Sequence, residues 1–192
     1  MENKLETFYP KNQEEWRKWL QSNHISKQSI WVIFYKKSSG KPTITWSEAV
    51  DEALCFGWID SVKKKLDEER SIQFFSKRKP NSTWSKINKE KVKQLIANNK
   101  LMPAGLACIE IAKKNGSWTI LDDVEELIIP ADLEQEFKKK KGAKNYFQSL
   151  SKSTQKALLQ WVVLAKQKET RNKRITEIVD CAAKGQKPKH LQ

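Results

Sequence analysis

Two tryptophans, an acid and an arginine are spaced along the first half of the chain so that together they could hold an anion. Trp58 and Asp60 stand at alternate positions of a β-rich stretch and should therefore share one face of a strand. Arg78 follows a second β-rich stretch, so a hairpin could bring its guanidinium near Asp60. Gly57 has no side chain and admits close approach. We expect a functional surface around these residues and Trp84.

Two arginines from the last part of the chain could face this surface. Arg171 and Arg174 are three residues apart on a predicted helix and are therefore neighbours, and the planar guanidinium suits planar anions. Two interpretations stay open. In one, Asp60 and the arginines form salt bridges between domains that only position the helices. In the other, part of the arginine charge is free to hold an anion in a cleft floored by tryptophan.

The sequence lacks the common signatures of nucleotide-binding and hydrolytic enzymes. It contains no glycine-rich phosphate loop, no dinucleotide fingerprint and no Gly-x-Ser-x-Gly elbow. With two histidines, His24 and His190, and no cluster of Cys and His, we expect neither a metal site nor a cofactor. The three widely spaced cysteines are interpreted as reduced, buried thiols: Cys55, Cys108 and Cys181.

The chain is strongly basic, with a formal net charge of +14 over 192 residues. Residues 129–192 carry 15 Lys and Arg against 6 Asp and Glu, whereas residues 1–128 carry 22 against 17. Such a balance favours anionic partners, nucleic acid above all. We therefore expect any polyanion binding to map to the C-terminal third. The alternative is a surface whose lysines only keep the protein in solution.

Apolar periodicity predicts an α+β fold with the strands in the N-terminal part. Capping and spacing signals predict helices over 12–22 and 45–56, and β-branched and aromatic runs predict strands over 29–37, 58–64 and 70–76, paired in a small antiparallel sheet. No apolar run approaches the roughly 20 residues that span a bilayer, and the N-terminus lacks the apolar core of a secretion signal. We expect a cytoplasmic protein.

The rest of the chain is predicted to be helical. Helices are expected from residue 88, from residue 102 and from residue 130, followed by a final αα-hairpin over 151–166 and 169–183 with Trp161 as its main anchor. The predicted organisation is an α+β domain at 1–100, a helical connection at 101–128, a helical basic domain at 129–185 and a loose tail at 186–192.

Several spaced motifs resemble one family. Glu52–Ser61 (EALCFGWIDS) is followed at close range by Phe74–Asn88 (FFSKRKPNSTWSKIN), and then by Met102–Leu106, Gly116–Trp118 and Ala165–Ile175. Together, over about residues 8–185, they are similar to the YdeI/OmpD-associated family, also called bacteriocin-protection proteins (OmdA). Where that family often has Thr-Pro-Arg, this chain has Ser76-Lys77-Arg78, which retains the arginine.

The resemblance implies a role in bacteriocin protection or stress resistance, and a distant link to frataxin-like α+β folds. It supplies no catalytic residues, and Ser82 in its second motif completes the set of candidate ligand-binding residues. Three functions are weighed: a non-catalytic protein that binds an anionic ligand or a partner protein, a nucleic-acid-binding protein, and an enzyme acting on a small anionic substrate. Neither the partner nor the oligomeric state follows from the sequence.

Overall fold

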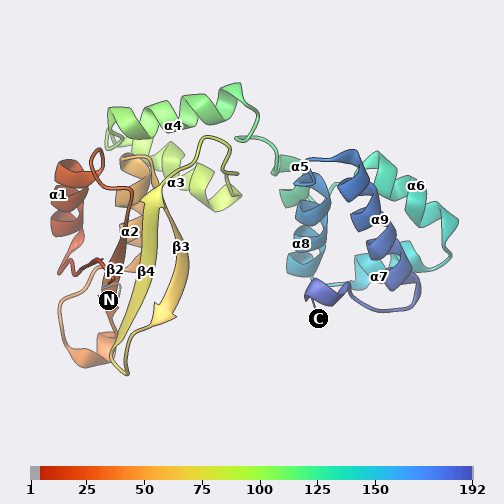
Figure 1. Cartoon of the computed structure of the whole chain (residues 1–192), viewed down its shortest axis with the longest axis horizontal. Coiled ribbons are helices and arrows are strands. Elements are labelled where there is room, and N and C mark those ends of the chain that lie inside the picture. The colour runs from red at the N-terminus through yellow and green to blue at the C-terminus, as the bar shows by residue number, and fades with distance from the viewer. Residues whose placement is uncertain (1–4, 192) are drawn as a thin grey trace. The chain divides into compact units, whose positions relative to one another are not determined.

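The computed structural model describes residues 5–191, and within them the chain forms two compact units that meet between Trp118 and Thr119. The first unit is mixed α and β and the second is helical (Figure 1), which confirms the α+β class. The predicted boundaries after residues 100 and 128 differ from this division. Residues 101–118 belong to the first unit because their helix contributes Ile109 and Ala112 to its core.

The first unit contains a four-stranded sheet with the order β1-β2-β4-β3 (Figure 1). The strands are β1 (Thr7–Phe8), β2 (Ser29–Tyr35), β3 (Trp58–Lys65) and β4 (Arg70–Lys77). β4 pairs antiparallel with both β2 and β3, as predicted. The short β1 pairs parallel with β2, so the sheet is mixed and not wholly antiparallel.

Four helices accompany the sheet: α1 (Gln13–Asn23), α2 (Trp46–Cys55), α3 (Lys86–Ala97) and α4 (Pro103–Lys114), with a short 3-10 turn, η1 (Lys37–Ser39). α2 begins at the predicted capping box, in which Thr45 and Glu48 satisfy each other's backbone N–H groups. α3 begins earlier than predicted, because Ser85 and not Asn88 is its N-cap.

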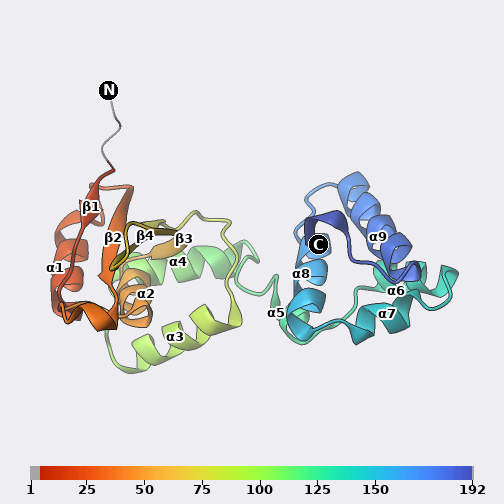
Figure 2. The same ribbon diagram turned by 90° about the horizontal axis from the view of Figure 1, so that it is seen from below.

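The core of this unit lies between the helices and one face of the sheet. Figure 2 shows α2 and α3 on the same side of the strands. Trp16 from α1, Trp58 from β3 and Phe75 from β4 are fully buried there and belong to one apolar cluster. Trp58 and Phe75 reach it together because they share a sheet face, as strand alternation requires.

The second unit is built from helices alone and has its own core. Its elements are α5 (Asp122–Glu125), α6 (Ala131–Lys139), α7 (Ala143–Ser149), α8 (Lys152–Val163), α9 (Lys168–Ala183) and a 3-10 turn, η2 (Lys189–Leu191). The predicted hairpin of the last two helices is present, and α9 also packs against α6 and the unpredicted α7.

Two details of the C-terminal prediction are corrected. Trp161 is only partly buried, and the buried anchors of α8 are Leu158, Leu159 and Val162, which lie on its inward stripe. The tail is not loose as far as it is described, since Pro188 is buried and Leu191 packs against the core; residue 192 lies outside the described residues. No helix in residues 5–191 has the length and apolar character that crossing a membrane requires.

Candidate functional site

The candidate site lies where the end of α2, the start of β3, the end of β4 and the start of α4 meet. Gly57 follows Phe56, the C-cap of α2, and its φ of +72° lets the chain reverse into β3. The carbonyl of Gly57 accepts a hydrogen bond of 2.9 Å from the backbone N–H of Arg78. α4 approaches closely because Gly105 has no side chain: a Cβ there would lie 2.4 Å from the carbonyl oxygen of Cys55. These contacts fix four elements around one point.

A cavity of about 560 Å³ opens at this junction. Its lining is mostly apolar, with two cationic side chains and one imidazole among the residues that form it: His24, Ile25, Phe56, Gly57, Trp58, Lys77, Arg78, Met102, Pro103, Ala104 and Cys108. A cavity of this size with few polar groups is typical of sites for small molecules.

The buried charged group in the cavity wall is Arg78, which is only 9% exposed. Its guanidinium carbon lies 3.6 Å from the ring centroid of Trp84, and its Nη2 donates to the carbonyl of Thr83. Its Nε and Nη1 are buried and have no hydrogen-bond partner in the structure. Burial lowers the pKa of Arg78 to about 10, which still leaves the group charged at neutral pH. Arg78 therefore brings to the cavity wall a positive charge that the protein itself satisfies only in part.

The first turn of α4 adds a second feature that favours negative charge. No side chain caps this helix, and its N-cap is Met102. Pro103 has no N–H, so the amides of Ala104 and Gly105 are the first that a helix of this kind leaves without an internal acceptor. Met102, Pro103 and Ala104 all line the cavity. The positive end of the helix and the guanidinium therefore border the same space.

Two further residues of the cavity were not among the predicted site residues. His24 lines it, and its Nδ1 lies 2.9 Å from the carbonyl oxygen of Leu20, which requires the proton on Nδ1. Cys108 lines it as well, and burial raises the pKa of its thiol. Their positions follow from the packing of α1 and α4 against the sheet, which residue spacing does not reveal.

Asp60 does not belong to this cavity. Its carboxylate accepts hydrogen bonds from Trp46 Nε1 at 2.8 Å and from Gln73 Nε2 at 3.0 Å, and it forms no ion pair with Arg78 or any other described residue. Trp58 and Asp60 share a face of β3, as predicted. The negative charge of Asp60 acts to raise the pKa of Arg78, although burial outweighs it and the two groups form no ion pair.

The other predicted residues divide between the two units. Trp84 supports the Arg78 guanidinium from behind, while Ser82 lies in the turn before it, outside the cavity lining, where its N–H bonds to Lys79. Arg171 and Arg174 lie in the second unit, and both are engaged there. Arg171 binds both carboxylate oxygens of Asp132, at 2.6 and 3.0 Å. Arg174 donates to the carbonyl of Trp161 at 2.5 Å and lies over its ring.

Each of the two units contains a segment that matches a known protein family. The family described as "Domain of unknown function (DUF8412)" matches residues 8–108, which include the whole cavity. The family described as "Bacteriocin-protection, YdeI or OmpD-Associated" matches residues 126–185. By the match over residues 8–108, which is more than half of its length, this chain belongs to the DUF8412 family. Its residues 126–185 are similar to the YdeI/OmpD-associated family.

The match narrows the family resemblance that the motifs suggested. The YdeI/OmpD-associated match covers the second unit, and the motifs at 52–61 and 74–88 fall in the segment that the other family matches. Searches among curated proteins and among solved structures found no match. The frataxin-like character of the first unit stays a prediction.

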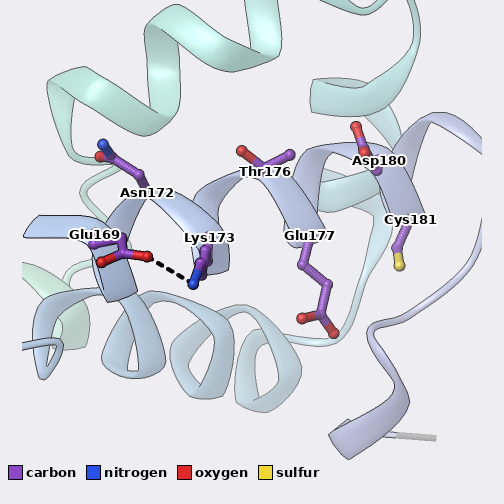
Figure 3. A pocket seen from close by; sticks show the side chains of 7 residues that line it. All are labelled: Glu169, Asn172, Lys173, Thr176, Glu177, Asp180 and Cys181. Atoms are coloured by element: carbon purple, nitrogen blue, oxygen red, sulfur yellow. Dashed lines mark ion pairs between the residues drawn. The ribbon is translucent and has the colours of Figure 1, made fainter.

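The YdeI/OmpD-associated unit has a hollow of its own, on the outside of α9. Figure 3 shows its seven lining side chains along this one helix, with an ion pair of 2.8 Å between Glu169 and Lys173. Three acids and a single lysine border the hollow, so it does not suit an anion. Asp180 at its end is already paired with Lys140 at 2.6 Å.

Neither the cysteines nor the possible metal ligands of the described residues form a second candidate site. All three cysteines are free, as predicted, but only Cys55 is fully buried, while Cys108 and Cys181 are partly exposed. Among residues 5–191, no three side chains of His, Cys, Asp or Glu are grouped as a metal ion would need. The cavity at Arg78 is therefore the site on which we base the function.

Proposed function

We propose that this protein is a non-catalytic binding protein that holds an anionic ligand in the cavity of its first unit. The observation that carries the proposal is Arg78, a buried guanidinium with two nitrogens that have no partner. Buried charges are ordinarily paired, because removing a charge from water costs several kcal/mol. A ligand that presents an acceptor to Nε and Nη1 would remove this penalty on binding.

The lining indicates a ligand with a compact acidic group and an apolar body. Arg78 and the uncapped start of α4 favour a carboxylate or a similar anion at one end. Phe56, Trp58 and Met102 offer apolar contact to the rest of the molecule. We therefore take a medium-chain carboxylate as the probe of the site.

The state of the Cys108 thiol in the cavity wall favours binding over nucleophilic catalysis by this residue. Burial raises the pKa of the Cys108 thiol, so at neutral pH the sulfur is protonated and weakly nucleophilic. The enzyme alternative would need another reacting group.

The cellular role that we propose is protection against bacteriocins or related stress, as the name of the family over residues 126–185 suggests. A cytoplasmic location stays a prediction. The nucleic-acid alternative is favoured by a different surface, the outer face of the sheet.

The proposal is tested by comparing octanoate with octanol, which share the apolar body and differ in the charged group. Isothermal titration calorimetry on the full chain should show octanoate binding about 10- to 100-fold more tightly, because a hydrogen bond to a charged group contributes roughly 1.5–3 kcal/mol. Arg78→Met, which keeps the length of the side chain and removes its charge, should abolish this preference.

Lys93→Met is the matched control, because it removes one positive charge from an exposed position on α3 of the same unit. It should leave the preference for octanoate unchanged. Equal affinity for the acid and the alcohol in the wild-type chain would contradict the proposal. So would a preference that survives in Arg78→Met, since general attraction to a basic protein would then explain it.

A further inference from the structure

The face of the sheet that points away from α2 carries aromatic and apolar side chains. Trp31 stands opposite Phe74, and Ile33 stands opposite Ile72. Ile72 is buried and the other three are half-buried, and none of the four belongs to the core cluster that Phe75 shares on the other face. Figure 2 shows the strands edge-on, with α2 and α3 together on the core side. Antiparallel sheets with one solvated face ordinarily present polar residues on it, so this composition calls for an explanation.

Cations lie directly over the aromatic rings of this face. The ring centroids of Trp31 and Phe74 are 5.1 Å apart, and Lys64 Nζ lies 5.0 Å from the Trp31 centroid. Tyr35, which shares the face of Trp31 by strand alternation, has Lys41 Nζ 4.8 Å from its ring. The distance from Phe74 along β4 to its end at Arg70 is about 13 Å. Flat rings and positive charges therefore alternate over this length.

A basic hollow of about 490 Å³ adjoins the aromatic rows at the end of the hairpin. It is lined by five cations against one acid, together with one serine: Lys36, Lys63, Lys64, Lys65, Asp67, Arg70 and Ser71. Arg70 is paired with Asp67 and Lys65 with Glu68. Lys36, Lys63 and Lys64 form no ion pair with a described residue. Lys64 pairs with Ile72 and therefore shares the face of Trp31 and Phe74, whereas Lys63 pairs with the buried Gln73 and lies on the α2 side of the sheet. One uncompensated positive charge, that of Lys64, therefore lies beside the half-buried rings.

We propose that this outer face of the sheet binds single-stranded nucleic acid. Unpaired bases would stack on Trp31 and Phe74, with Lys64 moving from the Trp31 ring to a phosphate beside it and Lys41 at Tyr35 holding another phosphate. A duplex keeps its base faces stacked internally and could use only the lysines. An acidic peptide would likewise satisfy the charges but leave the ring faces without a partner. The combination of rings and cations on one flat surface therefore favours a single strand.

The test is fluorescence anisotropy of a labelled oligo-dT of about fifteen nucleotides, titrated with the full chain at several salt concentrations. Trp31→Ala should weaken binding roughly 5- to 100-fold, the loss expected for one stacked base, while Trp31→Phe should retain most of the affinity because it keeps a ring. Lys64→Gln should weaken binding and lower the salt slope by about 0.7, the value for one phosphate contact on a single strand.

Lys93→Gln removes the same charge from the helical side of the unit and should leave both affinity and salt slope unchanged. Thermal unfolding of each variant separates lost binding from lost structure. The proposal is overturned by an absence of binding at low salt, by equal binding of a duplex of the same length, or by a folded Trp31→Ala that binds like the wild type. It is also overturned if sedimentation shows that Trp31→Ala dissociates a dimer, because a second copy would then be the occupant of this face.

Discussion

At the scale of single residues, the first unit holds one arginine in an unusual state. Arg78 is buried with two free nitrogens, whereas Arg17 in the same unit donates to the buried carboxylate of Glu52 at 2.6 Å. The sequence predicted Arg78, Trp58 and Trp84 as site residues, and all three meet at or behind the cavity. Asp60 is near enough for its charge to act on the pKa of Arg78, but it forms no ion pair with it, because Trp46 and Gln73 hold its carboxylate.

The contrast between the two arginines predicts opposite effects on stability without ligand. Arg78→Met should leave the free energy of unfolding unchanged or raise it by roughly 1–2 kcal/mol, since a buried charge without a full set of partners is replaced by an apolar side chain. Arg17→Met should lower it by about 1–3 kcal/mol, because Glu52 loses its cation while it stays buried. Urea unfolding of the ligand-free chain measures both. A clear loss of stability in Arg78→Met would indicate a structural role for Arg78.

At the scale of elements, local sequence signals predicted most helices and strands. They did not predict the short helix α7 or the unit to which α4 belongs, which depend on tertiary packing. The capping box at Thr45 and the alternation in β3 and β4 were sufficient to place those elements. α7 was missed, because it has only seven residues and no side-chain cap. α4 was predicted as a helix but assigned to a connection, because nothing in its own sequence shows that Gly105 fits against α2.

The close approach of α4 to α2 gives a prediction at this scale. Gly105→Ala places a methyl group about where backbone atoms of Leu54 and Cys55 lie, so α4 must shift. Overpacking of this kind costs about 1–3 kcal/mol, and the shift should also weaken octanoate binding because Met102 and Ala104 line the cavity. Ala107→Leu, at an exposed position of α4, is the control and should affect neither. A Gly105→Ala chain with unchanged melting temperature would show that the helices are not held this tightly.

At the scale of the whole molecule, the chain consists of two units with separate hydrophobic cores. Counted by these units, residues 1–118 carry 22 Lys and Arg against 13 Asp and Glu, and residues 119–192 carry 15 against 10. The acidic stretch at 122–126 belongs to the second unit, which reverses the expected asymmetry and removes the basis for placing polyanion binding in the C-terminal third. Composition alone could not show this distribution of charge, because the boundary between the units depends on which residues pack into each hydrophobic core.

The division predicts that residues 1–118 fold without the rest of the chain. A chain shortened to 1–118 should unfold cooperatively and bind octanoate with the preference of the full protein, because its core and its cavity are complete. A chain shortened to 1–100, the domain predicted from the sequence, should not, because it lacks Ile109, Ala112 and the α4 wall of the cavity. Circular dichroism during heating distinguishes the two. Cooperative unfolding of 1–100 would show that α4 is dispensable.

The central claim is that an anion contacts the free nitrogens of Arg78, and the most direct measurement is the Nε–H resonance of this side chain in a ¹H–¹⁵N NMR spectrum. The resonance is assigned by its loss in Arg78→Met. Titration with octanoate should shift it progressively to saturation, at the concentrations at which calorimetry detects binding, while octanol should leave it close to its starting position. A resonance that does not move while octanoate binds, or that moves equally with octanol, would contradict the account.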